Sequence, residues 1–143
     1  MLKKKVIIFG ASGQIGRNII RKATEKNYKV TAVTRNLHKS LFLKTQAPIG
    51  YLDIIQANIF DEAVLENLID QHDVCVNLIG ILYEKKNNTF KNIHVNFPSI
   101  LSKICKKKKL EQLIHLSALA VENAKDSNYA ISKTEGENIV KKN

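Results

Sequence analysis

The sequence predicts an α/β protein in which helices cover both faces of a parallel, five-stranded sheet. Short runs of apolar, mostly β-branched residues alternate with segments whose apolar residues recur at helical spacing. These short runs are apolar throughout, as is typical of strands that are buried on both faces. Right-handed crossovers then predict a doubly wound sheet with strand order 3-2-1-4-5, and a ligand site between the first and fourth strands.

The elements follow one another in a regular order. The expected strands are 6–9, 30–33, 52–55, 74–79 and 113–116. Asp61 and either Ser127 or Asn128 are expected to begin helices, because their side chains can accept hydrogen bonds from free backbone amides. Pro98 lies inside the longest helical pattern and predicts a kink. The helical faces expected to be buried are Ile15, Ile19, Ile20 and Ala23; Val64, Leu65, Leu68 and Ile69; and Ile93, Phe97, Ile100, Leu101, Ile104 and Cys105.

The length and composition fit one domain spanning residues 1–143. The chain is 44% hydrophobic and 25% charged, which is ordinary for a globular protein with a single core. No segment approaches the roughly 20 apolar residues of a membrane-spanning helix, and the apolar run near the start is too short for a signal peptide. We therefore expect a cytoplasmic protein. Cys75 and Cys105 have no metal-ligand spacing, so we expect buried, reduced thiols and no metal site.

The chain is strongly basic, with 23 Lys and Arg residues against 13 Asp and Glu residues and a formal charge of +10. Many lysines fall where the strands begin, opposite the predicted ligand edge. They provide a possible docking surface for an acidic protein or for an anionic membrane, such as the inner membrane; solvated lysines are the alternative. We expect no specific nucleic-acid binding, because no aromatic residues interleave them. These lysines are Lys3 to Lys5, Lys26, Lys29, Lys106 to Lys109, Lys141 and Lys142.

The first strand leads into the motif Gly10-Ala-Ser-Gly13-Gln-Ile-Gly16 and then into a helix. Gly10 permits a tight turn, Gly13 lets the backbone approach a pyrophosphate, and Gly16 permits close packing of helix and strand. The amides at the start of the helix, together with Ser12, Gln14 and Ile15, would surround the phosphates. The motif predicts a Rossmann-like domain that binds NAD(P). A Walker-type loop is excluded, because no Gly-Lys-Ser/Thr follows.

The second strand ends without the acidic residue that usually binds the ribose of NAD, roughly 20 residues after the glycines. Arg35 stands there instead and can bind a 2′-phosphate through two hydrogen bonds. NADP(H) is therefore favoured over NAD(H), with Arg17 or Lys39 as possible helpers; a solvated arginine is the alternative. Asn58 and the amide of Ile59 are expected to bind the adenine, unless Asn58 only turns the chain. Leu78, Ile79 and Gly80 would line the opposite side of the cofactor.

These residues resemble the extended or atypical short-chain dehydrogenase/reductases, which are similar to NAD-dependent epimerases and dehydratases. The resemblance rests on the glycine motif, the Asn58 to Asp61 turn, Gly80, Ser117 and Tyr129-Ala-Ile-Ser-Lys133. A narrower resemblance is to the nucleotide-binding accessory subunits of respiratory complex I and their bacterial relatives. It is carried by Val76-Asn-Leu-Ile-Gly80, Phe90, Val95 to Pro98, and Ile114-His-Leu-Ser117-Ala-Leu.

The resemblance implies roles for three further residues. Ser117 would hydrogen-bond a substrate oxygen, Tyr129 would exchange its proton as general acid and base, and Lys133 would bind the nicotinamide ribose. Tyr129 and Lys133 are four residues apart and share a helix face, and Ser117 follows the preceding strand. Tyr129 and Lys133 are therefore expected at the cofactor as well. His94 stands where active relatives often have Asn, and we expect it to be a packing or surface residue.

The resemblance implies that family members extend beyond the Tyr-x-x-x-Lys helix, so we expect this chain to match their N-terminal half, without the substrate-binding part. The first hypothesis is a module that binds NADP(H) as a structural or sensory ligand without turnover. The second is an NADP-dependent oxidoreductase or a nucleotide-sugar epimerase or dehydratase, whose other half comes from a complementing chain, a longer product or a homo-oligomer. The third is a truncated gene product without function.

Overall fold

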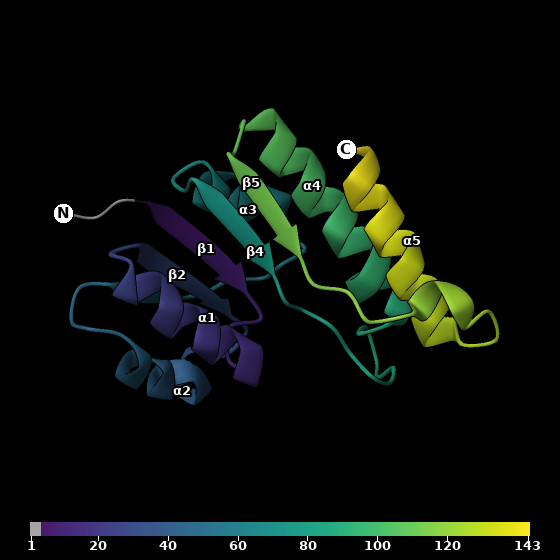
Figure 1. Cartoon of the computed structure of the whole chain (residues 1–143), viewed down its shortest axis with the longest axis horizontal. Helices are drawn as coiled ribbons and strands as arrows, with labels where there is room; N and C mark the ends of the chain where they lie inside the picture. The colour runs from purple at the N-terminus through teal and green to yellow at the C-terminus, as the bar shows by residue number, and fades with distance from the viewer. Residues whose placement is uncertain (1–3) are drawn as a thin grey trace.

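The computed structural model describes residues 4–143 and confirms the predicted fold class. Five parallel strands form one sheet in the order β3-β2-β1-β4-β5 (Figure 1). Because all strands run in the same direction, their carboxyl ends meet at one edge of the sheet, where the candidate site lies. The strands are β1 (Lys5–Phe9), β2 (Lys29–Thr34), β3 (Leu52–Gln56), β4 (Val74–Asn77) and β5 (Gln112–His115).

The helices divide between the two faces according to the direction in which the chain crosses the sheet. From β1 to β3 the chain moves from the centre of the sheet to the β3 edge, with α1 (Gln14–Glu25), α2 (Leu37–Ser40) and η1 (Leu41–Gln46) on one face. From β3 to β5 it moves the other way, with α3 (Glu62–Ile69), η2 (Lys91–Asn96) and α4 (Phe97–Lys107) on the opposite face (Figure 1). Right-handed crossovers require this change of face. After the short turn η3 (Val121–Asn123), α5 (Asn128–Lys142) packs against η2 and α4.

A separate apolar core lies on each face of the sheet. On β1, Val6 and Ile8 pack with Ile20 of α1, whereas Ile7 and Phe9 pack with residues of α3 and α4. All four β1 side chains are buried, which explains the unbroken apolar run in the sequence. Cys75 and Cys105 belong to the second core as free, buried thiols, as expected.

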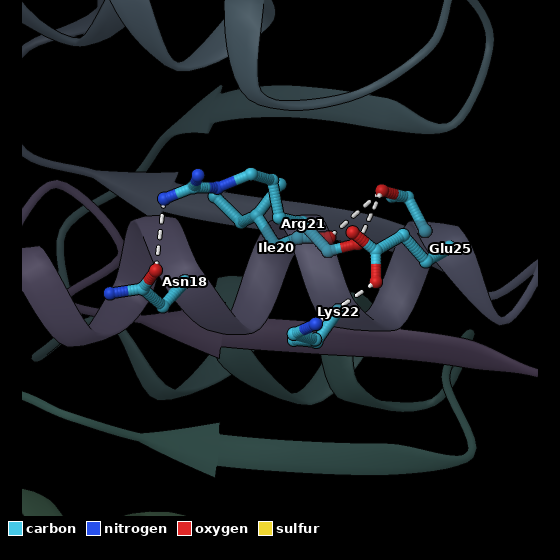
Figure 2. Close-up of polar contacts among 6 residues, drawn as sticks. Asn18, Ile20, Arg21, Lys22 and Glu25 are labelled. Atoms are coloured by element: carbon cyan, nitrogen blue, oxygen red, sulfur yellow. Dashed lines mark hydrogen bonds and ion pairs between the residues drawn. The ribbon is translucent and has the colours of Figure 1, made fainter.

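The solvent-facing side of α1 carries polar contacts that contribute little to stability. Arg21 donates a hydrogen bond to Asn18 Oδ1 at 2.9 Å, and Lys22 pairs with Glu25 at 3.3 Å (Figure 2). Such exposed pairs are worth about 1 kcal/mol or less, so the main attachment of α1 to the sheet is its apolar face, where Ile20 is buried and Ile19 and Ala23 pack beside it. The predicted buried face is wrong at Ile15, which is 51% exposed because the first turn of α1 lies at the carboxyl edge of the sheet.

The predicted boundaries need three corrections. β4 ends at Asn77 rather than at residue 79, because the Asn77 side chain accepts a hydrogen bond from the Ile79 amide at 3.1 Å and turns the chain. β5 runs from Gln112 to His115, one residue earlier than expected. The long helical segment divides into the π-helical η2 and α4, and Pro98 lies in the first turn of α4. Proline has no amide hydrogen, and its absence is tolerated in the first turn because the amides there have no partner within the helix.

Two helix starts agree with the sequence prediction. Asp61 accepts a hydrogen bond from the Val64 amide at the start of α3, and Ser127 accepts one from the Ala130 amide at the start of α5, each at 3.2 Å. No helix in the described part of the chain has both the length and the apolar character needed to cross a membrane.

Candidate functional site

The glycine loop, residues 10–16, connects the carboxyl end of β1 to α1 and presses against the end of β4. Gly10 has a φ of +83°, a left-handed conformation that side chains other than hydrogen disfavour. A Cβ at Gly10 would lie 3.0 Å from both the Ile79 amide nitrogen and the Leu78 carbonyl carbon. The first glycine therefore serves both the turn and the contact with the neighbouring strand.

Gly13 and Gly16 differ in their surroundings. A Cβ at Gly16 would lie 2.4 Å from the Ala11 carbonyl oxygen, so the start of α1 packs directly on the loop. A Cβ at Gly13 would meet no described protein atom within 4 Å, and Ser12, Gln14 and Ile15 are exposed beside it. Gly13 gives α1 no side-chain cap, and the first turn holds no acidic residue. The loop therefore presents an open helix N-terminus, which suits an anion.

The other side of the site is the segment Leu78–Gly80, which we call the β4 wall. Leu78 remains attached to the sheet because its amide donates to the Phe9 carbonyl at 2.8 Å. Leu78 and Ile79 are half-buried, whereas Gly80 is exposed. This segment faces the glycine loop through the contact at Gly10, so the structure brings these predicted cofactor residues together.

The end of β2 places Arg35 on the surface beside this edge. Its side chain is exposed and forms no ion pair with any described residue. Arg17, one of the possible helpers, lies over the Phe42 ring at 5.9 Å from the centroid. Lys39, the other, is exposed on α2, where its amide donates to the Asn36 side chain.

The turn after β3 has a local structural role. The Asn58 side chain accepts a hydrogen bond from the Phe60 amide at 3.0 Å, and the Asp61 amide donates to the Asn58 carbonyl. Asn58 therefore does turn the chain, toward the cap of α3. The Ile59 side chain is 7% exposed and belongs to the core, so only its backbone could meet an adenine.

A groove of about 530 Å³, lined by both polar and apolar side chains, begins beside this turn and was not predicted from the sequence. The Asn96 side chain donates to the Asn92 side chain at 3.0 Å, and Asn92 donates to the Asn87 carbonyl at 2.9 Å. The spacing of Asn92 and Asn96, four residues apart, is the one sequence signal for it. The lining residues are Phe60, Asn87, Asn92, Asn96, Ser99 and Ile100.

The structure brings Ser117 and Lys133 close together. Lys133 is 6% exposed, and its Nζ donates to the carbonyl of Leu116, the residue before Ser117, at 3.2 Å. The Ser117 Oγ is buried without a hydrogen-bond partner among the described residues. Tyr129 is half-buried and packs edge-on against Phe90, and no hydrogen bond in the described chain joins its hydroxyl to Ser117 or Lys133.

Burial controls the ionisation of the groups around this trio. Desolvation lowers the pKa of Lys133 from 10.5, and the nearby Glu137 opposes this shift. Desolvation also lowers the pKa of His115, followed by repulsion from Lys133. The strongest case is His94, 2% exposed, whose pKa is lowered to about 4 by desolvation and then by Lys133 and His115. His94 is thus buried and neutral at neutral pH. Of the two roles expected from the sequence, packing or surface, the structure shows packing.

Comparison with known proteins identifies the family. Residues 2–93 match the NmrA-like family. The chain belongs to this family. It is 25% identical over 134 residues to the mitochondrial NADH-ubiquinone oxidoreductase 40 kDa subunit of Neurospora crassa. It is 26% identical over 135 residues to the mitochondrial NADH dehydrogenase [ubiquinone] 1 alpha subcomplex subunit 9 of Mus musculus. Each alignment covers 94% of this chain and 36% of the relative, so the chain spans about a third of their length.

Solved structures of other proteins share the fold. A putative NAD-dependent epimerase/dehydratase from Bacillus halodurans superposes with a TM-score of 0.82 at 17% identity, covering 97% of this chain and 65% of that one. The Bordetella bronchiseptica enzyme WbmG in complex with NAD and UDP superposes with a TM-score of 0.79 at 16% identity, covering 96% and 49%. The resemblance to extended short-chain dehydrogenase/reductases and to the complex I subunits is therefore confirmed at the level of family and fold.

Proposed function

We propose that this chain binds NADP(H) at the carboxyl edge of the sheet and holds it as a structural or sensory ligand. The observation that carries the proposal is the open glycine loop, where a Cβ at Gly13 would meet no described protein atom within 4 Å. A pyrophosphate could occupy this space, accept hydrogen bonds from the free amides at the start of α1, and gain from the helix dipole. Leu78, Ile79 and Gly80 would contact the opposite side of the cofactor.

Arg35 supports the choice of NADP(H) over NAD(H). The segment Thr34-Arg35-Asn36 offers no carboxylate to the ribose hydroxyls, and the exposed guanidinium is free of ion pairs within residues 4–143. A guanidinium can bind a phosphate through two charge-assisted hydrogen bonds. The 2′-phosphate of NADP(H) would supply this acceptor, whereas NAD(H) lacks it.

Calorimetric titration with NADPH and NADH tests this assignment. Arg35→Ala is expected to weaken NADPH binding by about tenfold to a hundredfold, because hydrogen bonds to charged groups contribute about 1.5–3 kcal/mol. The same variant should leave NADH binding unchanged. Arg21→Ala is the matched control, because it removes an exposed arginine further along α1 that contacts Asn18. Equal losses for both cofactors in Arg35→Ala would contradict the NADP(H) preference.

The absence of turnover is supported by Tyr129. Its ring is packed against Phe90 and His94, and its hydroxyl is not hydrogen-bonded to Ser117 or Lys133 within the described chain. Tyr129 and Lys133 would then serve to hold the nicotinamide ribose. Two relatives are subunits of mitochondrial NADH-ubiquinone oxidoreductase or NADH dehydrogenase by name, and we propose a similar role as a nucleotide-binding module within an assembly.

The second candidate function is an NADP-dependent oxidoreductase or a nucleotide-sugar epimerase or dehydratase. The unpartnered Ser117 Oγ beside Lys133 favours it, because a buried hydroxyl without a partner is suited to receive a substrate oxygen. Single-turnover assays distinguish the two functions, with NADPH for a panel of aldehydes and ketones and with NADP+ for nucleotide sugars. Conversion that is lost in Tyr129→Phe would establish the enzyme, and no conversion by protein loaded with either form of the cofactor would support a cofactor that is held without turnover.

A partner surface is proposed at the opposite, amino edge of the sheet. Several of its lysines are neutralised within the molecule: Lys4 pairs with Glu111, Lys29 with Asp53, Lys107 and Lys108 with Glu66, and Lys141 with Glu137. Lys3 lies outside the described residues. The remaining lysines would bind an acidic protein or anionic lipid headgroups, because they have no acidic side-chain partner among residues 4–143: Lys5, Lys26, Lys106, Lys109 and Lys142. Flotation with anionic vesicles should decrease when Lys106 and Lys109 are changed to Ala; unchanged flotation would remove the membrane alternative.

A second surface is available for a copy of this chain or for a complementing chain. In the described sheet β5 pairs only with β4, and Ile114 of β5 is 44% exposed. Exposed apolar side chains beside an unpaired strand favour association. Sedimentation of the wild type and of Ile114→Lys tests self-association. The variant should be more monomeric, and a wild type that is monomeric at every concentration would leave only a complementing chain.

A further inference from the structure

His94 connects three segments that are distant in the sequence. Its Nε2 accepts a hydrogen bond from the Ile81 amide at 3.1 Å, and its Nδ1 lies 2.9 Å from the Ser132 Oγ. The Ser132 hydroxyl in turn donates to the Tyr129 carbonyl at 2.8 Å. Because Nε2 accepts and the Ser132 proton is already used, the ring proton must be on Nδ1, which donates to Ser132. The loop after β4, the helix η2 and the helix α5 are joined by one directed chain of hydrogen bonds.

The ring is held tightly at this position. Phe90 stacks on it with centroids 5.5 Å apart, and Tyr129 meets it edge-on at 5.4 Å. The His94 backbone is fixed as well, because a Cβ at Gly136 of α5 would lie 2.0 Å from the His94 carbonyl oxygen. His94 therefore has little freedom to shift relative to α5.

The same ring lies directly beneath the β4 wall. A Cβ at Gly80 would be 3.7 Å from both the His94 Nε2 and the Lys133 Nζ. Gly80 belongs to the wall proposed to contact the cofactor, and Lys133 belongs to the helix face proposed to bind the nicotinamide ribose. His94 thus lies between the β4 wall and the Lys133 face of α5. The distance between these two would determine the width of the nicotinamide end of the site.

We propose that neutral His94 is a positioning residue that fixes the β4 wall relative to the Tyr129–Lys133 face of α5 for cofactor binding. The proposal rests on the proposed function. The groups facing the ring are Tyr129 and Lys133 from α5 and His115 from β5, with Glu137 acting on Lys133 and His115. A proton at Nε2 would turn the acceptor for the Ile81 amide into a donor and add a second charge beside Lys133. Only the neutral ring satisfies both hydrogen bonds.

The test combines a cofactor-independent reading with a binding measurement. In His94→Phe, which keeps a ring to stack on Phe90, the Ile81 amide should exchange with solvent at least about tenfold faster, because its acceptor is lost. NADPH affinity should fall by at least about tenfold, as expected for a displaced wall. Nitrogen NMR of the wild-type ring should show the Nδ1-protonated tautomer at neutral pH.

His72→Phe is the matched control. His72 is also partly buried, and its two ring nitrogens contact the Leu68 carbonyl and the Thr31 hydroxyl at the other edge of the sheet. This variant should leave Ile81 exchange and NADPH affinity unchanged. Ser132→Ala is a milder variant that removes only the Nδ1 partner, and it should weaken NADPH binding in the same direction if His94→Phe does not fold.

The outcomes separate this inference from the function on which it rests. NADPH binding that survives unchanged in a folded His94→Phe or Ser132→Ala would overturn the positioning role while leaving the proposed function intact. The opposite tautomer, or unchanged Ile81 exchange in His94→Phe, would also overturn it. A wild type that binds neither NADPH nor NADH would overturn the proposed function itself, and the role of His94 in cofactor binding with it.

Discussion

Gly13 and Gly16 differ in what a larger side chain would meet, so the two positions separate folding from binding. Gly16→Ala should lower the free energy of unfolding by about 1–3 kcal/mol, because its methyl group would overlap the Ala11 carbonyl. Gly13→Val should cost less than about 1 kcal/mol, because the space around it is open and its φ of −76° suits any residue. Urea unfolding measures both values. Equal destabilisation would contradict the assignment of Gly13 to ligand space.

The same contrast should appear in cofactor binding. Gly13→Val is expected to abolish NADPH binding, because its side chain would occupy the space left for the pyrophosphate. Gly16→Ala should retain binding at temperatures where it is folded. The roles of Gly10 in the turn and of Gly16 in close packing were predictable from the sequence. The burial of Ile15 was predicted wrongly. Helical spacing alone does not reveal that the first turn of α1 reaches the edge of the sheet, where a side chain is left exposed.

Gly136 determines how closely α5 approaches η2. Its α-hydrogen faces the His94 carbonyl, and Gly136→Ala would place a Cβ 2.0 Å from that oxygen. The helices must then separate, and we expect a loss of about 1–3 kcal/mol in the free energy of unfolding. Asn138→Ala, on the exposed side of the same helix, is the control and should change stability little. Chemical unfolding of both variants checks this, and a stable Gly136→Ala would contradict the tight packing.

Helix starts that depend on neighbouring residues were predictable from the sequence. Contacts between elements that are distant in the sequence were not. Asp61 and Ser127 are recognisable as caps because a local side chain serves local amides. By contrast, the His94–Ser132 contact joins residues 38 positions apart, and the groove around Asn92 and Asn96 depends on the turn that carries Phe60. Pro98 was the one sign in the sequence that the long helix divides into η2 and α4. The sequence did not show that α4 begins at Phe97, which places Pro98 in its first turn.

The whole molecule should become less stable as the pH falls below neutrality. Desolvation lowers the pKa values of His72, His94 and His115 below 6.5. Below that value the unfolded chain takes up protons that the folded chain does not, so the free energy of unfolding decreases as pH falls. His94 alone, with a pKa of about 4, should account for about 2 kcal/mol between pH 7 and pH 5.

Urea unfolding at these two pH values measures the effect. Glu66, whose pKa is lowered from 4.5 by hydrogen bonds to Lys107 and Lys108, acts at lower pH and does not interfere. Replacing His94 with Phe should reduce the pH dependence and leave the contributions of His72 and His115. Equal stability of the wild type at both pH values would contradict the burial of the three neutral imidazoles.

The strand order of the whole sheet was predictable, because apolar runs and right-handed crossovers leave few alternatives. The pairing of surface lysines with Glu66 and Glu111 was not, because it depends on side chains from different elements. The predicted lysine-rich surface is therefore smaller in the folded molecule than the sequence suggests.

Amide NMR spectra recorded during titration with NADPH would test whether the dinucleotide binds at the carboxyl edge of the sheet. We expect shifts at the amides of the glycine loop, Arg35 and the β4 wall, with no change at residues 106–109 on the opposite edge. Shifts confined to that lysine-rich edge, or no shifts at saturating NADPH in a folded protein, would contradict a dinucleotide site at the carboxyl edge of the sheet.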